Sequence, residues 1–197
     1  MAMEFYGALY PQDGVSDYLK VTLTNSKYSV SGYLSQGAAM NLAQSWEAPF
    51  SGMNLGSISG TIGGAAQIAT GLTSVARWNS LMVWEGGTPP TLTLPIIFLA
   101  QFNPFIEVSG AIAALSAMVS PQLKDVNKPL KPEGRIPEKV TLNIGRRIML
   151  VDILIQDMSF DLDAPRSSTG LFLRNTVNLQ LSGATIYNSS DFIGAFQ

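Results

Sequence analysis

Three aspartates close together in the last third of the chain are the first candidates for chemistry. Asp157, Asp161 and Asp163 follow one another within a short stretch, and Ca²⁺ is bound by such carboxylate oxygens. Their spacing is not that of a calcium-binding loop, and no glutamate follows where a bidentate ligand would complete one. We interpret them as the solvated tip of a hairpin and predict no metal site.

Two glutamates beside tryptophans are the second candidate. Glu47 follows Trp46, and Glu85 follows Trp84. A carboxylate pair flanked by aromatic platforms is an arrangement that hydrolyses glycosidic bonds. Two such neighbours also arise easily by chance, so this pattern does not by itself assign an activity.

The residue types on which most enzymes depend are missing. The chain has no histidine and no cysteine, which removes the commonest general base and the thiolate nucleophile. Gly60, Gly63 and Gly64 resemble part of a phosphate-binding loop, but no Lys-Ser or Lys-Thr pair follows them. We therefore predict that the protein is not an enzyme and has no catalytic residues, no cofactor and no metal.

Alternating apolar and polar residues predict the strands. In 19–24, Leu19, Val21 and Leu23 alternate with polar residues, and the segment 171–182 alternates along its whole length. Pro95 lacks an amide hydrogen, so its strand should lie at an edge or carry a bulge. The other segments of β character are 28–34, 77–84, 91–101, 139–144 and 148–160, the last continuously apolar as in a central strand.

One helix is clearly predicted. Asn103 is a good N-cap, and Pro104 suits the first helical position. An apolar stripe with helical spacing follows, and the opposite face is serine and alanine, so we expect both faces to be covered. The whole chain, 1–197, is expected to be one α+β domain with an antiparallel sheet or sandwich and a flanking helix over 104–119. The predicted stripe consists of Phe105, Val108, Ile112, Leu115 and either Met118 or Val119.

Two segments interrupt this domain. The segment 36–76 is rich in glycine and alanine yet carries regular large apolar residues, which indicates an arm that packs against another backbone. The segment 120–137 is a long loop with four prolines and several basic residues. The predicted contacts with partners in these segments are Trp46, Phe50, Ile58, Ile62, Ile68, Lys124, Lys128, Lys131 and Arg135.

The composition indicates that neighbours cover much of the surface. Only 13% of the residues are charged and 46% are hydrophobic, whereas ordinary soluble domains are about 25% charged. Large permanent interfaces are depleted in charge in this way. The net charge of −2 gives the whole chain no attraction for nucleic acid. We predict a subunit of a larger assembly.

A membrane span and export are not expected. The stretch 86–106 has no charge and is long enough to cross a bilayer. However, Pro89, Pro90, Pro95 and Pro104 would break a spanning helix. The first residues lack a basic segment followed by an apolar run, and the absence of cysteine suits a reducing compartment. We expect assembly in the cytoplasm without a membrane.

The order of several motifs resembles one family. Val83-Trp84-Glu85-Gly86-Gly87 precedes a strand and the predicted helix, and Trp46-x-x-Pro49-Phe50 precedes the glycine-rich arm. A last hairpin is expected near the end of the chain. Its two strands are 151–160 and 173–179, and a polar loop joins them. Together these pieces, about two thirds of the chain, resemble the baseplate proteins that initiate the tail tube of contractile-tailed bacteriophages. The C-terminal peptidoglycan-binding repeat of some relatives is missing.

The resemblance implies a tail-tube-like β-sandwich that forms a ring of six copies in the virion. Its partners would be itself, the tail tube protein, the baseplate hub and other baseplate proteins, and the tape measure protein. DNA would only pass through the lumen. A closed ring needs a heterologous interface on each subunit. The residues expected to face the lumen are Asp157, Asp161, Asp163, Arg174, Thr176, Asn178 and Gln180.

Two alternatives stay open. The chain could be the tail-tube subunit itself, which differs from an initiator in copy number. It could also be a carbohydrate-binding β-sandwich with Trp46, Trp78 and Trp84 as stacking platforms, in which case a soluble monomer would bind glycans.

Overall fold

A computed structural model describes residues 2–8, 13–47, 81–121 and 137–196. The chain divides into two compact units. The larger unit consists of Met1–Leu42 with Pro89–Gln197, and the smaller unit is Ala43–Thr88. The protein is mostly β, with a 15-residue helix and a short C-terminal helix in the larger unit.

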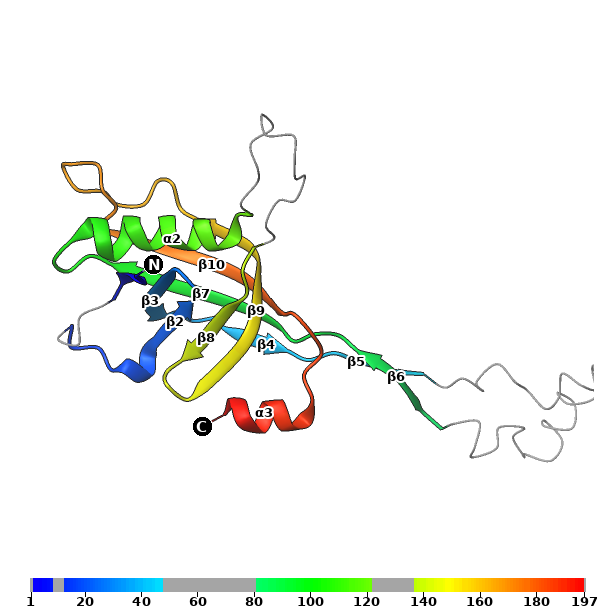
Figure 1. Cartoon of the computed structure of the whole chain (residues 1–197). Helices are drawn as coiled ribbons and strands as arrows, with labels where there is room; N and C mark the ends of the chain where they lie inside the picture. Colours follow the sequence, from blue (N-terminus) through cyan, green and yellow to red (C-terminus); the bar gives the residue numbers. More distant parts are fainter. Residues whose placement is uncertain (1, 9–12, 48–80, 122–136, 197) are drawn as a thin grey trace, which may run out of the picture. The chain divides into compact units, whose positions relative to one another are not determined.

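Six antiparallel strands form a closed barrel in the larger unit (Figure 1). Their order around the barrel is β3-β2-β8-β9-β10-β7, and a short pairing between β3 and β7 closes it. Two further strands flank these: β1 (Glu4–Gly7) runs parallel to β3, and β4 (Ala39–Asn41) pairs with β7. The barrel strands are β2 (Lys20–Thr24), β3 (Tyr28–Leu34), β7 (Thr91–Leu99), β8 (Val140–Ile144), β9 (Ile148–Phe160) and β10 (Arg174–Gly183).

The alternating pattern fills the barrel with apolar side chains. Gly32 is needed inside, because a Cβ there would lie 2.3 Å from Cγ2 of Ile96. The predicted antiparallel sheet is confirmed, but it is a barrel and not a sandwich. Periodicity shows which face of a strand is buried, not which strands pair. The fully buried core includes Val21, Leu23, Leu94, Ile96, Phe98, Leu142, Leu150, Ile153, Val177 and Leu179.

The flanking helix begins with a π-helical turn, η4 (Phe105–Ser109), and continues as α2 (Gly110–Val119). As predicted, Asn103 caps it: its Oδ1 accepts from the amide of Phe105 at 3.0 Å. The stripe prediction is confirmed for its later members, which are buried, with Met118 as the last of them. It is wrong for Phe105, which is 57% exposed because the wider π turn changes the angular position of the residues before α2.

Two further predictions need correction, and one helix was missed. Leu19 ends a 3₁₀ turn, η1 (Asp17–Leu19), and is exposed, so the strand begins one residue later. Pro95 lies in an inner strand and not at an edge. The carbonyl of Pro95 accepts a hydrogen bond from the amide of Ser35. Pro95 lies between the residues of β7 that pair with β3 and those that pair with β4, so the amide hydrogen that proline lacks is not needed for a hydrogen bond between strands. The C-terminal helix α3 (Ser189–Ala195) was not predicted.

The smaller unit contains a two-stranded antiparallel ladder, β5 (Gln44–Glu47) with β6 (Val83–Gly87). The strand predicted over 77–84 therefore extends further than expected, because Gly86 and Gly87 still pair. The first part of the predicted insertion includes β4, which pairs with β7 of the larger unit. Its remainder from 48 onward lies outside the described residues, as do 77–80 of the predicted strand.

Candidate functional site

The β5–β6 ladder exposes large apolar side chains. Trp46 and Trp84 lie directly opposite each other and are 55% and 52% exposed. The indole nitrogen of Trp84 donates to Oε1 of Gln44 at 2.8 Å. No residue of β5 is buried, and Val83 is exposed as well. The ladder therefore presents aromatic surface that nothing in its own unit covers among the described residues.

A hollow of about 410 Å³ lies within the same unit, lined by residues of the ladder and its ends. Its walls are small and uncharged: Ala43, Gln44, Ser45, Gly86, Gly87 and Thr88. Gly86 has a φ of +147° beside a register shift in the ladder, a conformation that favours glycine. The described walls of this hollow thus carry no charged side chain, whereas the ladder itself carries the exposed Glu47 and Glu85.

Of the predicted contact residues, only Trp46 lies in the described part of the chain. Its exposure is compatible with the predicted role, which no observation here tests. The others fall within 48–80 and 122–136, outside the described residues: Phe50, Ile58, Ile62, Ile68, Lys124, Lys128, Lys131 and Arg135.

The residues predicted to face the lumen gather on one side of the barrel. In β10, the exposed or half-buried residues alternate with buried ones, which confirms the predicted alternation. Gln180 lies opposite Asp157 of β9 and accepts a hydrogen bond from Thr93 of β7. The outward face of β10 therefore carries polar side chains, with Asp157 of β9 and Thr93 of β7 beside them. From β10 it presents Arg174, Thr176, Asn178 and Gln180.

Asp161 and Asp163 follow β9 in the loop to β10 and are exposed. The buried side chain of Asn175 fixes the start of this loop: its amide donates to the carbonyl of Asp161 at 2.8 Å, and its oxygen accepts from the amide of Asp161. Within the described ranges, no three acidic side chains come close enough to hold a metal ion. The sequence pattern placed Asn175 on the inward face but gave no indication of this role.

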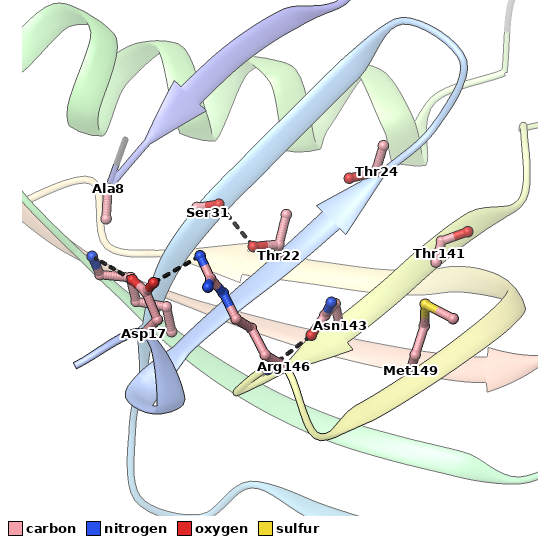
Figure 2. A pocket seen from close by; sticks show the side chains of 10 residues that line it. Ala8, Asp17, Thr22, Thr24, Ser31, Thr141, Asn143, Arg146 and Met149 are labelled. Carbon is pink, nitrogen blue, oxygen red and sulfur yellow. Dashed lines mark hydrogen bonds and ion pairs between the residues drawn. The ribbon is translucent and has the colours of Figure 1, made fainter. Parts of the chain in front are cut away.

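A second hollow, about 670 Å³ in volume, lies on the outward face of β2, β3 and β8 (Figure 2). Its floor consists of side chains with hydroxyl or amide groups, and the hydroxyls of Thr22 and Ser31 are 2.8 Å apart. At one end Arg146 reaches Asp17, with 2.8 Å between Nη2 and Oδ2. The floor is formed by Thr22, Thr24, Ser31, Thr141 and Asn143.

Behind this end lies a buried ion pair. Nζ of Lys20 is 2.8 Å from Oδ2 of Asp13, which also accepts from the hydroxyl of Tyr33. Burial would raise the pKa of Asp13, but hydrogen bonds from Lys20, the amide of Val15 and Tyr33 outweigh it and lower that pKa. Burial would lower the pKa of Lys20, but its bonds to Asp13 and Asp17 raise it. Both charged groups of this pair are therefore held in their ionised forms, and the pair stabilises the fold.

The structural role of Glu107 was not predicted from the sequence. It is 3% exposed, and its Oε2 accepts from the backbone amides of Gln101, Phe102 and Asn103 at 2.7, 3.0 and 3.0 Å. A buried carboxylate persists only when hydrogen bonds compensate its lost solvation. Glu107 therefore fixes the loop between β7 and the helix. Its position just inside a predicted helix was the only available signal.

Among the helices of the described residues, none combines the length and apolarity needed to cross a bilayer. No protein-family model matches the sequence. No curated protein matches it significantly.

Proposed function

We propose that the chain is a structural subunit that forms a ring in the baseplate of a contractile phage tail and initiates or caps the tail tube. The observation that carries this proposal is the β5–β6 ladder, which exposes Trp46, Val83 and Trp84 to solvent. An isolated two-stranded ladder is marginally stable in water. A neighbouring subunit that covers these side chains would stabilise it, and aromatic side chains dominate protein interfaces.

The outward face of β9 and β10 supports a channel-lining role. A lumen through which DNA passes must not retain it, and neutral or acidic side chains provide no positive charge that attracts phosphates. Asp157 on this face, with Asp161 and Asp163 in the adjoining loop, would repel the DNA backbone, although Arg174 on the same face would attract it. Replacing the three aspartates by asparagine should raise DNA retention in assembled tails. Unchanged retention would remove the lumen assignment.

The central experiment is a reconstitution with tail components. The purified full chain should form rings visible by electron microscopy, alone or with the baseplate hub. Small amounts of these rings should shorten the lag in polymerisation of the tail tube protein, because a preformed ring supplies the first layer. A chain that stays monomeric and soluble at millimolar concentration, with no effect on the tube protein, would refute the proposal.

The tail-tube subunit is the nearest alternative within the same particle. Counting copies per virion distinguishes the two, since an initiator contributes one ring and a tube subunit many.

A carbohydrate-binding module is the second candidate, favoured by the opposed Trp46 and Trp84. Stacking on a sugar ring would occur on the isolated chain. Binding of the soluble monomer to a glycan array, lost in Trp84→Ala, would support this function. Absence of binding at millimolar glycan would dismiss it.

A further inference from the structure

The larger unit carries a group of exposed apolar side chains at one end of the barrel. We call it the end patch. It lies where β7 and β9 finish and β10 begins: the amide of Ala100 donates to the carbonyl of Leu173 at 2.8 Å, and Asn175 of β10 bonds to Asp161 after β9. The end patch consists of Leu99, Phe102, Phe105, Leu162 and Leu173.

A second group lies where β9 begins and β10 has ended. We call it the C-terminal patch. Ile148 forms an isolated bridge with Phe196, and the hydroxyl of Tyr187 donates to the carbonyl of Val151. These contacts hold the last helix and its approach against the edge of β9. The C-terminal patch consists of Met149, Val151, Ile186, Ile193 and Phe196.

The two patches lie toward opposite ends of β9. β9 has 13 residues and a strand rises about 3.3 Å per residue, so the strand is at most roughly 40 Å long. Figure 1 shows α3 at the end of the barrel away from the loop that precedes α2. One subunit therefore cannot bring its own end patch to its own C-terminal patch.

The patches are similar in size. Their side chains are 38–71% exposed in the end patch and 41–79% exposed in the C-terminal patch. Since a large apolar side chain has roughly 200 Å² of surface, each patch presents on the order of 500 Å². Apolar patches of this size mark interaction sites. Docking one on the other would bury about 1,000 Å² of apolar surface, close to the lower limit of about 1,200 Å² for a specific interface.

The end patch is also held in a fixed conformation. Glu107 binds the three consecutive amides that precede the helix, and the guanidinium of Arg166 lies 4.5 Å from the ring centre of Phe172 beneath the neighbouring loop. A surface that is already ordered loses little entropy on binding. Fixed apolar anchors of this kind are typical of the centres of protein interfaces.

Charged side chains of both signs border the patches. Arg174 lies opposite Leu99 in the ladder, and the exposed Asp161 and Asp163 lie in the loop before it. Beside the C-terminal patch, Asp152 pairs with Lys139 at 3.3 Å. The contact therefore depends on the apolar side chains and not on opposite net charges.

From these observations we infer that successive copies of this chain associate head to tail, the end patch of one copy docking on the C-terminal patch of the next. Two unlike patches of equal size on one rigid unit fit a heterologous contact, which closes into a ring when the rotation allows. A two-fold contact of one patch with itself would leave the other exposed. The inference rests on the proposed ring and names its subunit contact.

Complementing variants test this contact. Leu162→Asp spoils only the end patch, and Ile193→Asp spoils only the C-terminal patch. Both residues are more than two thirds exposed, so the fold should persist, which circular dichroism verifies. Asn178→Asp, on the exposed middle of β10, adds the same charge away from both patches. Sedimentation of the wild-type chain, each variant and the mixture of the two gives the assembly state.

We expect each single variant to lose at least tenfold in self-association, and Asn178→Asp to behave as wild type. The mixture should form 1:1 dimers, because each variant retains the patch that the other lacks. If the wild-type chain assembles and both variants assemble equally well, the contact is wrong and the ring proposal stands. If only one variant is affected and mixing rescues nothing, the contact is two-fold. A wild-type chain that never associates with itself, either alone or with the baseplate hub, overturns both proposals.

Discussion

Removing the carboxylate of Glu107 should destabilise the protein more than any other single glutamate change among the described residues. The side chain is buried, and one of its oxygens accepts three backbone hydrogen bonds. Glu107→Gln keeps the shape but removes the charge, and Glu107→Ala removes every acceptor. The two variants separate the contribution of the charge from that of the hydrogen bonds.

The expected magnitudes follow from these contacts. A hydrogen bond to a charged group contributes about 1.5–3 kcal/mol. Three bonds to one oxygen are not additive, and water can reach part of the freed loop, so we expect Glu107→Ala to cost roughly 3–5 kcal/mol of unfolding free energy. Glu107→Gln retains a neutral acceptor and should cost roughly 1–2 kcal/mol. For a chain of this length, 1 kcal/mol lowers the Tm by about 2–4 °C.

Denaturant unfolding followed by circular dichroism gives these free energies. Glu4→Gln is the matched control, because Glu4 is exposed and bonds only the hydroxyl of Tyr6 among the described residues. It should stay within about 0.5 kcal/mol of wild type. If Glu107→Ala were as stable as wild type, the carboxylate would not be holding the loop, and the fixed geometry of the end patch would lose its support.

Three further predictions concern the pH dependence, the core and the ladder. Since the folded pKa of Asp13 is lowered, its stabilisation is complete above the unfolded value of about 3.9 and is lost as pH falls through the folded pKa. Asp13→Asn should therefore cost roughly 2–4 kcal/mol at pH 7 and progressively less than that below about pH 3; a constant difference in urea unfolding would contradict this. Gly32→Ala forces a Cβ against Ile96 and should cost about 1–3 kcal/mol, and a Tm equal to that of wild type would show that the barrel can relax. Trp84→Ala should change the stability of the monomer by less than about 0.5 kcal/mol but weaken assembly about 30-fold, measured by sedimentation; unchanged assembly would remove the ladder from the interface.

Local patterns determined the six barrel strands and the main helix, whereas β1, β4 and β5 were not predicted. β9 has the predicted bounds, and β10 alternates as expected, because inward positions must be apolar wherever one face of a strand is buried. Asn103 and Pro104 indicated the start of the helix through the chemistry of capping. The composition, with 13% charged residues, led to the prediction of covering partners, which remains to be tested.

Pairing and long-range contacts were decided only by the tertiary structure. The barrel closes through two residue pairs between β3 and β7, and periodicity carries no information on pairing partners. Glu107 reads as an ordinary polar residue near a helix start, yet it is buried because the loop folds back over it. The two apolar patches are separated in sequence and gather only where the barrel brings strand ends together. Local sequence patterns indicate the environment of single residues, whereas a site made of residues distant in the sequence depends on distances that only the folded structure sets.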